Sequence, residues 1–190
     1  MEPLTLGEIA AAIGVQQQSA GTAVVRGVCT DTRQGCVGTV FFALSGERAD
    51  GHAYVQAAAK AGAVAAVVQR PVDDAPIPQL VVNDTLQALG DLARWYGQRF
   101  DIAKVGVTGS VGKTSVRSMT AAVLSARFNV CESERNHNNE IGVPLTVLSL
   151  EGHHTAAVVE MAMRGRGQIA YLADIVRPCV GVVTKIGVSH

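Results

Sequence analysis

The sequence predicts an α/β protein built from two units, a mixed α/β domain over residues 1–100 and part of a parallel-sheet domain over residues 101–190. Short apolar runs alternate with segments of helical periodicity along the chain, which is the pattern of βαβ units. The runs at 103–107, 155–160 and 179–184 are almost continuously apolar, as expected of parallel strands that are buried on both faces. A parallel sheet covered by helices therefore accounts for the second unit.

Cap and turn residues set the expected elements of the first unit. Thr5 is placed to cap the first helix, Gly62 to end the second, and Asn83-Asp84 to begin the third. A proline-rich loop, RPVDDAPIP, separates the last two strands. The expected elements are helices at 5–13, 52–61 and 85–99, and strands near 23–29, 39–44, 63–69 and 79–82.

The second unit is expected to alternate strands with helices. Its strands are placed at 103–107, 128–131, 155–160 and 179–184, and its helices at 113–126, 143–150 and 167–174. The chain ends just past a strand, where βα units usually continue. We therefore expect this sequence to be the N-terminal part of a longer protein.

Composition excludes several classes of protein. The chain is 48% hydrophobic and 17% charged, so it can bury a core, and its formal net charge is zero. Lys and Arg are scattered, so no nucleic-acid partner is expected. The sequence contains no apolar stretch of roughly 18 residues, so no membrane span is expected. The N-terminus, MEPLTLGEIAAAIG, lacks the basic start of a signal peptide, which favours a cytoplasmic protein.

The cysteines point in the same direction. Cys29, Cys36, Cys131 and Cys179 have no metal-ligand spacing. We expect reduced, mostly buried thiols, as is usual in the cytoplasm.

The glycine-rich turn in VGVTGSVGKTSV (105–116) carries the clearest chemistry. It lies between a strand and a helix, so its backbone N–H groups and the helix N-terminus can bind phosphate. Lys113 is placed to reach the β- and γ-phosphates, and the Thr114 hydroxyl is a natural Mg²⁺ ligand. The strict GxxxxGK[ST] pattern fails at one position, because residue 107, where its first glycine would be, is a valine. The candidate nucleotide-binding residues are Thr108, Gly109, Ser110, Val111, Gly112, Lys113, Thr114 and Ser115.

Two further candidates follow later strands. Glu160 ends TAAVVE and His190 ends TKIGVSH, and ligands gather at the carboxyl ends of strands in an open parallel sheet. Glu160 is thus a candidate Mg²⁺ ligand, although a helix cap or a salt-bridge partner is equally consistent with its position. His190 alone is typical of a surface histidine. The loop RNHNNEIGVP (135–144) offers amides that can bind phosphate or sugar oxygens, or simply form turns.

Taken together, TGSVGKTS, NHNNEIGVPLT, VVEMAMRGRGQIAYLADIVRP and TKIGVSH resemble the ATP-dependent Mur ligases of peptidoglycan synthesis, most closely the MurF type. TDTR (30–33) and VFFALSGERADGHAYVQAAAKAGA (40–63) are similar to the substrate-binding domain of that type. The resemblance covers almost the whole chain, and the shorter P-loop is the one this family uses. It implies a UDP-sugar-binding domain at 1–100 and the first part of a P-loop ATPase domain at 101–190.

The resemblance also implies the reaction and its participants. ATP phosphorylates the terminal carboxylate of UDP-MurNAc-tripeptide, and the amine of D-Ala-D-Ala attacks the acyl phosphate. Lys113, Glu160 and His190 match catalytic positions, with Thr114, Glu160 and His190 as Mg²⁺ ligands. Asn139 matches a nucleotide-binding position. The positions that match substrate-binding segments are Thr30, Asp31, Thr32, Arg33, Gly46, Arg48, Asp50, His52 and Asn138. The full-length protein is expected to be a monomer.

Alternatives remain at this point. The family's carbamylated lysine, adenine-contacting segment and C-terminal domain would lie after residue 190, so we expect this chain alone not to complete the reaction. A MurE-type ligase is the nearest rival, and Ser115 together with NNEIGVPLT disfavours it. Folylpolyglutamate synthase lacks a separate uridine-binding domain. A truncated, non-catalytic UDP-sugar-binding module is the alternative from a different class.

Overall fold

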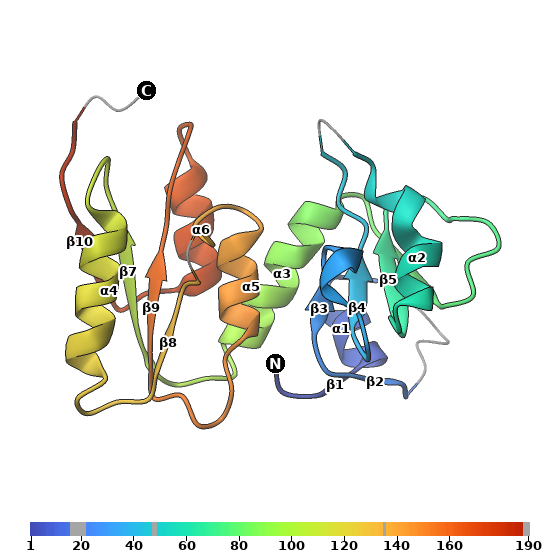
Figure 1. Cartoon of the computed structure of the whole chain (residues 1–190), viewed down its shortest axis with the longest axis horizontal. Helices are drawn as coiled ribbons and strands as arrows, with labels where there is room; N and C mark the ends of the chain where they lie inside the picture. The colour runs from blue at the N-terminus through green and yellow to red at the C-terminus, as the bar shows by residue number, and fades with distance from the viewer. Residues whose placement is uncertain (16–21, 47–48, 135, 188–190) are drawn as a thin grey trace. The chain divides into compact units, whose positions relative to one another are not determined.

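The computed structural model divides into two compact units, Met1–Leu92 and Ala93–His190 (Figure 1). The residues that it describes are 1–15, 22–46, 49–134 and 136–187. Both units contain a four-stranded parallel sheet, which confirms the α/β class. None of the helices in the described part of the chain has the length and apolar character that crossing a membrane requires.

The first unit is built on the parallel sheet β3-β4-β5-β6. A separate antiparallel pair, β1-β2, precedes this sheet in the sequence. Its strands are β1 (Leu4–Thr5), β2 (Val24–Val25), β3 (Val28–Cys29), β4 (Val40–Phe42), β5 (Ala65–Val68) and β6 (Gln79–Val81). Its helices are α1 (Leu6–Ala12), η1 (Thr32–Gln34), η2 (Gly51–Tyr54), α2 (Val55–Lys60) and the first part of α3 (Thr85–Gly97).

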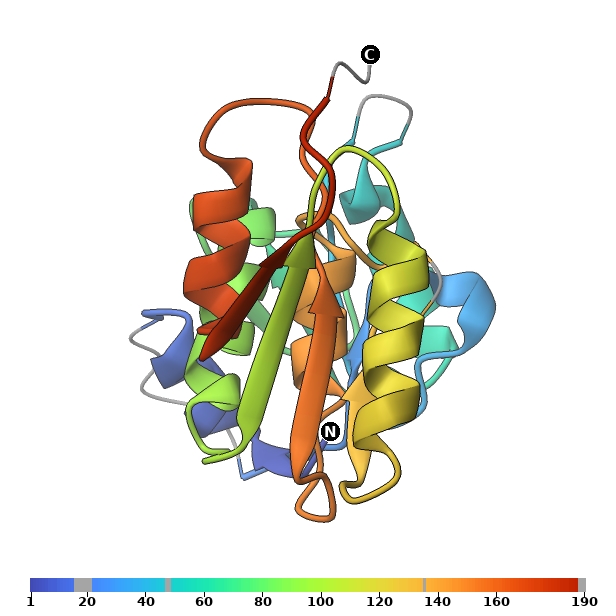
Figure 2. The ribbon, with the colours of Figure 1, turned by 90° about the vertical axis from the view of Figure 1, so that its left-hand side faces the viewer.

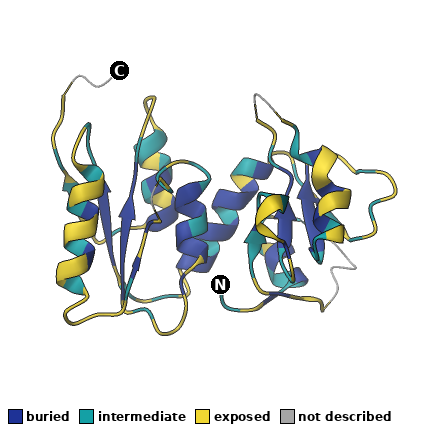
Figure 3. Ribbon diagram, viewed as in Figure 1, coloured by how far each residue is buried: buried dark blue, intermediate teal, exposed yellow. Residues whose placement is uncertain are grey.

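Local signals explain these elements. Thr5 and Glu8 form a reciprocal capping box at the start of α1. The carboxylate of Asp84 accepts hydrogen bonds from the first N–H groups of α3, as the sequence predicts. Strands β4 and β5 are fully buried, which matches their continuous apolar runs (Figure 3).

One predicted strand is wrong in detail. The expected strand 23–29 is divided at Arg26 and Gly27 into β2, which pairs with β1, and β3, which pairs with β4. The Arg26 N–H donates to the Gly38 carbonyl instead of to either sheet. This contact comes from a distant turn, so the hydrophobic pattern of the segment does not reveal the division.

The second unit is a parallel sheet with helices on both faces. Its strands are β7 (Ala103–Thr108), β8 (Val130–Glu132), β9 (Ala156–Glu160) and β10 (Val180–Val183). Its helices are α4 (Lys113–Leu124), α5 (Gly142–Leu148) and α6 (Gln168–Val176), all within a few residues of their predicted positions. Within this unit, α4 covers one face of the sheet and α5 and α6 cover the other (Figures 1 and 2).

The strand order β10-β7-β9-β8 creates a switch point between β7 and β9. From β7 the chain crosses through α4 to β8, on the far side of β9. From β9 it crosses through α6 to β10, on the far side of β7. The two connections leave in opposite directions, which opens a crevice at the carboxyl ends of β7 and β9, where open α/β sheets bind ligands.

Candidate active site

The glycine-rich loop leaves β7 at this switch point and opens helix α4. Gly109 has φ +137° and Gly112 has φ +82°, conformations that side chains with a Cβ rarely adopt. The loop is held by its neighbours, because the Ser110 N–H donates to the Lys185 carbonyl at 2.7 Å and the Thr184 hydroxyl donates to the Val111 carbonyl at 2.7 Å. Gly112 caps α4 without a side-chain hydrogen bond, so the first N–H groups of the helix are available to an anion.

Lys113 lies across this loop. Its Nζ donates to the Gly109 carbonyl at 2.8 Å and to the Ser110 carbonyl at 3.3 Å. No carboxylate accepts from it among the hydrogen bonds and ion pairs of the described residues. Because carbonyl partners are weak compared with phosphate oxygens, this ammonium can move to a bound phosphate without breaking an ion pair.

Thr114 and Glu160 meet at the crevice. The Thr114 hydroxyl donates to Glu160 Oε2 at 2.9 Å, and Asn138 Nδ2 donates to Glu160 Oε1 at 2.8 Å. Glu160 is only 1% exposed, and its own N–H donates to the Ser133 hydroxyl. The carboxylate therefore has a defined position at the carboxyl end of β9.

A hydroxyl and a carboxylate in contact are the donor set that fits Mg²⁺. This cation takes oxygen ligands and keeps several waters, so few protein ligands are needed when phosphates supply the rest. No group of three or more His, Cys, Asp or Glu that could hold a metal occurs within the described ranges, which argues against a closed, all-protein metal site there. Thr114 and Glu160 fit such an ion, and their role as its ligands stays a prediction. The third predicted ligand, His190, lies outside the described residues.

The sequence reasoning missed Arg117. This guanidinium is 7% exposed, donates from Nη1 to Glu132 at 3.0 Å and to the Ser133 carbonyl, and places Nε 3.7 Å from Glu160 Oε2. Arg117 thus places a buried positive charge beside the Glu160 carboxylate. The only signal in the sequence is an arginine one helical turn after Lys113, which could equally be exposed.

A cavity of about 940 Å³ in the second unit is lined by four of the nine predicted nucleotide-binding residues, Thr108, Gly109, Ser110 and Lys113. Asn138, predicted to bind the substrate, lines it as well. The same wall includes Arg164 and Arg166 from the loop between β9 and α6, which the sequence reasoning did not single out.

Two predicted nucleotide-binding residues, Asn139 and Ser115, do not line this cavity. The Asn139 side chain accepts from the N–H groups of Ile141 and Gly142, so it caps α5 instead of lining the cavity. Ser115 is exposed on the first turn of α4. Their roles in nucleotide binding remain predictions.

The first unit has a separate cavity of about 370 Å³ at the carboxyl end of β3. The predicted segment Thr30–Arg33 lines it together with Gly51 and Tyr54. Gly51 is required there, because a Cβ would lie 2.6 Å from backbone atoms of Ala43 and Leu44.

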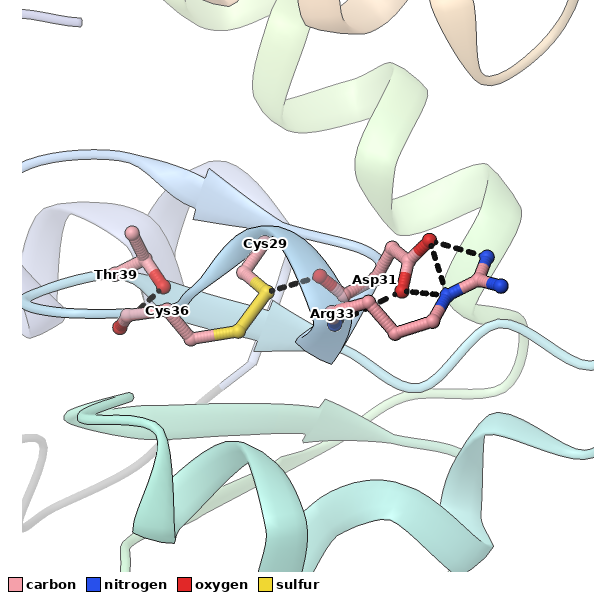
Figure 4. The surroundings of a disulfide bond; sticks show 5 residues. All are labelled: Cys29, Asp31, Arg33, Cys36 and Thr39. Carbon is pink, nitrogen blue, oxygen red and sulfur yellow. Dashed lines mark hydrogen bonds and ion pairs between the residues drawn. A yellow bond between two sulfur atoms is a disulfide. The ribbon is translucent and has the colours of Figure 1, made fainter.

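Asp31 and Arg33 form a bidentate ion pair on this wall, with Arg33 Nε 2.9 Å and Nη2 2.6 Å from the carboxylate (Figure 4). The side-chain hydrogen bond from Arg33, followed by its backbone N–H, lowers the pKa of Asp31 to about 2. The pair therefore stays ionised across the physiological pH range.

Two further predicted substrate residues, Asp50 and His52, flank Gly51 in the chain. His52 is buried, its Nδ1 contacts Asp50 at 2.6 Å, and its Nε2 accepts from the Gln69 N–H at 2.8 Å. These contacts assign the proton to Nδ1, and hydrogen bonds from His52 and Arg70 lower the pKa of Asp50. Both ring nitrogens are thus occupied, and neither His52, Asp50 nor Gly46 lines the cavity. Arg48 lies outside the described residues.

The expectation of reduced thiols is wrong for two cysteines. Cys29 and Cys36 form a disulfide that closes the loop carrying Thr30–Arg33 (Figure 4). Their Cα atoms are 5.5 Å apart, within the range that a disulfide requires. The chain returns from η1 toward the end of β3, and this proximity is a tertiary feature that cysteine spacing does not encode. Cys131 and Cys179 are free, the first buried and the second exposed.

Two descriptions of one protein family match separate segments of this chain. The Mur ligase middle domain matches residues 107–190, and the catalytic domain of the Mur ligase family matches residues 24–96. The first match covers the P-loop and the Glu160 strand, and the second covers the cavity of the first unit.

Similar proteins and structures agree with this result. A UDP-N-acetylmuramoyl-tripeptide–D-alanyl-D-alanine ligase of Synechocystis is 50% identical over 87% of this chain and 37% of its own length. A crystal structure of MurF from Acinetobacter baumannii has a TM-score of 0.93 and 34% identity, over 100% of this chain and 42% of that one. MurF ligase from Thermotoga maritima in complex with ADP has a TM-score of 0.78 and 32% identity, over 86% and 38% respectively. This chain thus spans about two fifths of the length of these relatives.

Proposed function

This chain belongs to the Mur ligase family, and we propose that it is the substrate-binding and ATP-binding part of a ligase that joins D-Ala-D-Ala to UDP-MurNAc-tripeptide. The reaction forms an amide C–N bond in peptidoglycan precursor synthesis and uses ATP. Residues 1–100 would bind the uridine nucleotide sugar, and residues 101–190 the ATP phosphates. Nucleotide sugars and ATP are cytoplasmic metabolites, so we place the protein in the cytoplasm, where a disulfide such as Cys29–Cys36 is uncommon. We expect the full-length protein to be a monomer.

One observation carries this proposal. At the switch point between β7 and β9, a glycine-rich loop that carries Lys113 lies next to a hydroxyl–carboxylate pair, Thr114 and Glu160, separated by 2.9 Å. A phosphate loop alone is compatible with many nucleotide-binding proteins. An Mg²⁺-type donor pair at the same end of the sheet is what phosphoryl transfer needs.

The residues of this chain divide the work of the first step. A carboxylate is a poor electrophile until a phosphoryl group turns one of its oxygens into a leaving group. The attacking carboxylate and the γ-phosphate are both anions, so Lys113 would offset their repulsion. The N–H groups of the glycine loop and of the first turn of α4 would orient the phosphates. Mg²⁺ held by Thr114 and Glu160 would supply further positive charge to the phosphate oxygens.

The alternatives are less well supported. A MurE-type ligase is not favoured, because the relatives quoted above carry the name of the D-alanyl-D-alanine ligase or of MurF. A non-catalytic binding module would still need both cavities, and a binding measurement does not exclude it. The activity of the full-length protein decides between a ligase and a non-catalytic binding module.

The proposal is tested by calorimetric titration of this chain with UDP-MurNAc-tripeptide and with a non-hydrolysable ATP analogue plus Mg²⁺, using a folate as the negative control. We expect the uridine ligand and the ATP analogue to bind and the folate not to bind. Lys113→Ala should lower the affinity for the ATP analogue at least tenfold, because it removes a charge-assisted contact. Lys60→Ala, at the exposed end of α2, is the matched control and should leave both affinities unchanged.

Full-length protein extends this test to the chemistry. There, Lys113→Ala should lower turnover more than a hundredfold, since one preorganised charge-stabilising group typically contributes about 3–4 kcal/mol to the transition state. A loss below tenfold with the fold intact contradicts the role of Lys113. A folded sample of this chain that binds neither the uridine ligand nor the ATP analogue contradicts the proposed function as a whole.

A further inference from the structure

Two arginines on the wall of the second-unit cavity are not used in the proposed phosphorylation step. Arg164 and Arg166 follow β9 in the loop that leads to α6, and both are exposed to the cavity that Lys113 also lines. Among the described residues, neither guanidinium has a hydrogen-bond or ion-pair partner. Guanidinium groups at a cavity wall that are not used within the protein are available to a ligand.

The loop that carries them is braced by a hydrogen-bond network. The Gln168 side-chain oxygen accepts from the N–H groups of Arg164 at 2.5 Å and Gly165 at 2.9 Å. The Gln168 amide nitrogen donates to Glu140 Oε1 at 2.6 Å, and the start of the loop is tied by the Ala162 N–H to the Asn138 carbonyl at 2.7 Å. The backbone of the loop is therefore fixed, which lowers the entropy that a ligand must remove on binding.

The charge of the cavity wall is unbalanced. Its lining contains Lys113, Arg164 and Arg166 but no Asp or Glu, within the residues that the structure describes. Glu160 is buried beneath Thr114 and Asn138 and is already hydrogen-bonded to both. Three cations without a facing carboxylate select an anionic ligand.

The position of the arginines separates them from the phosphate loop. Lys113, the loop glycines and the start of α4 lie after β7, whereas the arginines lie after β9, on the other side of the switch point. Both loops lie at the same end of the sheet (Figure 2). The phosphates thus have their own set of donors, and a planar guanidinium suits a carboxylate, which it can bind through two parallel hydrogen bonds.

We infer that Arg164 and Arg166 form a carboxylate-binding site for the peptide part of the substrate, next to the phosphates that activate it. This inference rests on the proposed function. The two side chains hold an acidic peptide so that its reacting carboxylate lies beside the ATP, and they offset part of the negative charge that the peptide brings to the cavity. They recognise carboxylates, and the uridine end of the substrate does not depend on them.

The test compares two uridine ligands that differ in carboxylates. UDP-MurNAc-tripeptide carries a peptide, and UDP-GlcNAc carries no carboxylate at all. Both are titrated calorimetrically into this chain, into Arg164→Gln/Arg166→Gln, and into the control Arg127→Gln. Arg127 is an exposed arginine just after α4 that does not line the cavity, so its replacement makes the same type of charge change elsewhere.

We expect the wild-type chain to prefer the peptide ligand, and the double variant to lose this preference by about a hundredfold, or about tenfold per charge-assisted contact. The affinities for UDP-GlcNAc and for the ATP analogue should change less than twofold, and Arg127→Gln should behave like wild type. All substituted side chains are exposed, so the thermal unfolding midpoint should not change and serves as the check on folding.

Three results would overturn the inference while the proposed function stands. In the first, the double variant keeps its preference for the peptide ligand over UDP-GlcNAc to within threefold of wild type. In the second, it loses affinity for the ATP analogue instead, which assigns the arginines to phosphate. In the third, the wild-type chain binds both uridine ligands equally. Absence of binding by any uridine ligand is a different result, because it contradicts the proposed function itself.

Discussion

The two cavities are built on the same plan and stabilised by different means. In each unit, a loop at the carboxyl end of a parallel strand forms part of the cavity wall: residues 30–36 after β3, and residues 109–112 after β7. The first loop is closed by the Cys29–Cys36 disulfide and carries the Asp31–Arg33 ion pair. The second has no covalent link and depends on glycine conformations and hydrogen bonds to residues 184–185.

This difference matches what each loop offers a ligand. The first loop presents side chains, Thr30, Asp31, Thr32 and Arg33. Side chains need a fixed backbone to be placed accurately, and a covalent closure of the loop provides it. The second loop presents its own backbone N–H groups, so residues without side chains and with positive φ are essential, and a bridge is not needed. The two loops should therefore fail under different perturbations.

The largest effect is expected when the glycine loop is altered. A Cβ at Gly109 would lie 2.1 Å from Thr184 Oγ1 and 3.1 Å from the Thr184 nitrogen, at φ +137°. Gly109→Ala should lower the free energy of unfolding of the second unit by about 3 kcal/mol and weaken the ATP analogue more than tenfold. Uridine-ligand affinity should not change. The control is Gly112→Ala, where an added Cβ meets nothing within 4 Å, so only the strain of φ +82° remains, about 1 kcal/mol. Equal effects at both glycines, measured by chemical denaturation and calorimetry, would contradict this account.

Reduction of the disulfide should produce a smaller effect, confined to the first unit. The bridge joins residues seven apart, and closing so short a loop stabilises a protein by about 2 kcal/mol in the chain-entropy model. Dithiothreitol should therefore lower the unfolding midpoint of the first unit and weaken UDP-sugar binding, while the ATP analogue binds as before. Cys29→Ser/Cys36→Ser should reproduce both effects and no longer respond to dithiothreitol. A wild-type chain that binds uridine ligands equally well with and without the reductant contradicts the idea that the bridge shapes this cavity.

Much of this architecture could be predicted from the sequence, because the signals are local. Apolar runs, the Thr5 capping box and Asp84 set the elements to within a few residues. The glycine loop and Glu160 were placed at one edge of the sheet because carboxyl ends of parallel strands coincide. The structure confirms that Thr114 and Glu160 are in contact.

The features that could not be predicted depend on contacts between distant segments. The disulfide needs the return of the chain after η1, and the buried position of Arg117 needs the partners Glu132 and Ser133, fifteen and sixteen residues away. Asn139 illustrates the reverse case. Its side-chain oxygen accepts from the N–H groups at the start of α5, and its role in nucleotide binding stays a prediction. Residue type alone does not reveal which of two nearby partners a polar group will take.

The smallest expected effect concerns the ion pair inside the disulfide loop. The pKa of Asp31 is about 2, below its ordinary value of 3.8, because Arg33 donates to it from the side chain and the backbone. A lowered pKa means that the contribution of the pair to stability is complete above about pH 4 and is lost as the pH falls through 2. Arg33→Gln removes the side-chain bonds but keeps the backbone one, so the midpoint of Asp31 in a carboxyl-carbon NMR titration should rise part of the way toward 3.8. Arg26→Gln, an exposed arginine of the same unit, should leave it unchanged. A midpoint near 3.8 in the wild-type chain would show that the ion pair does not persist in solution, and the disulfide would then be the main constraint on this loop.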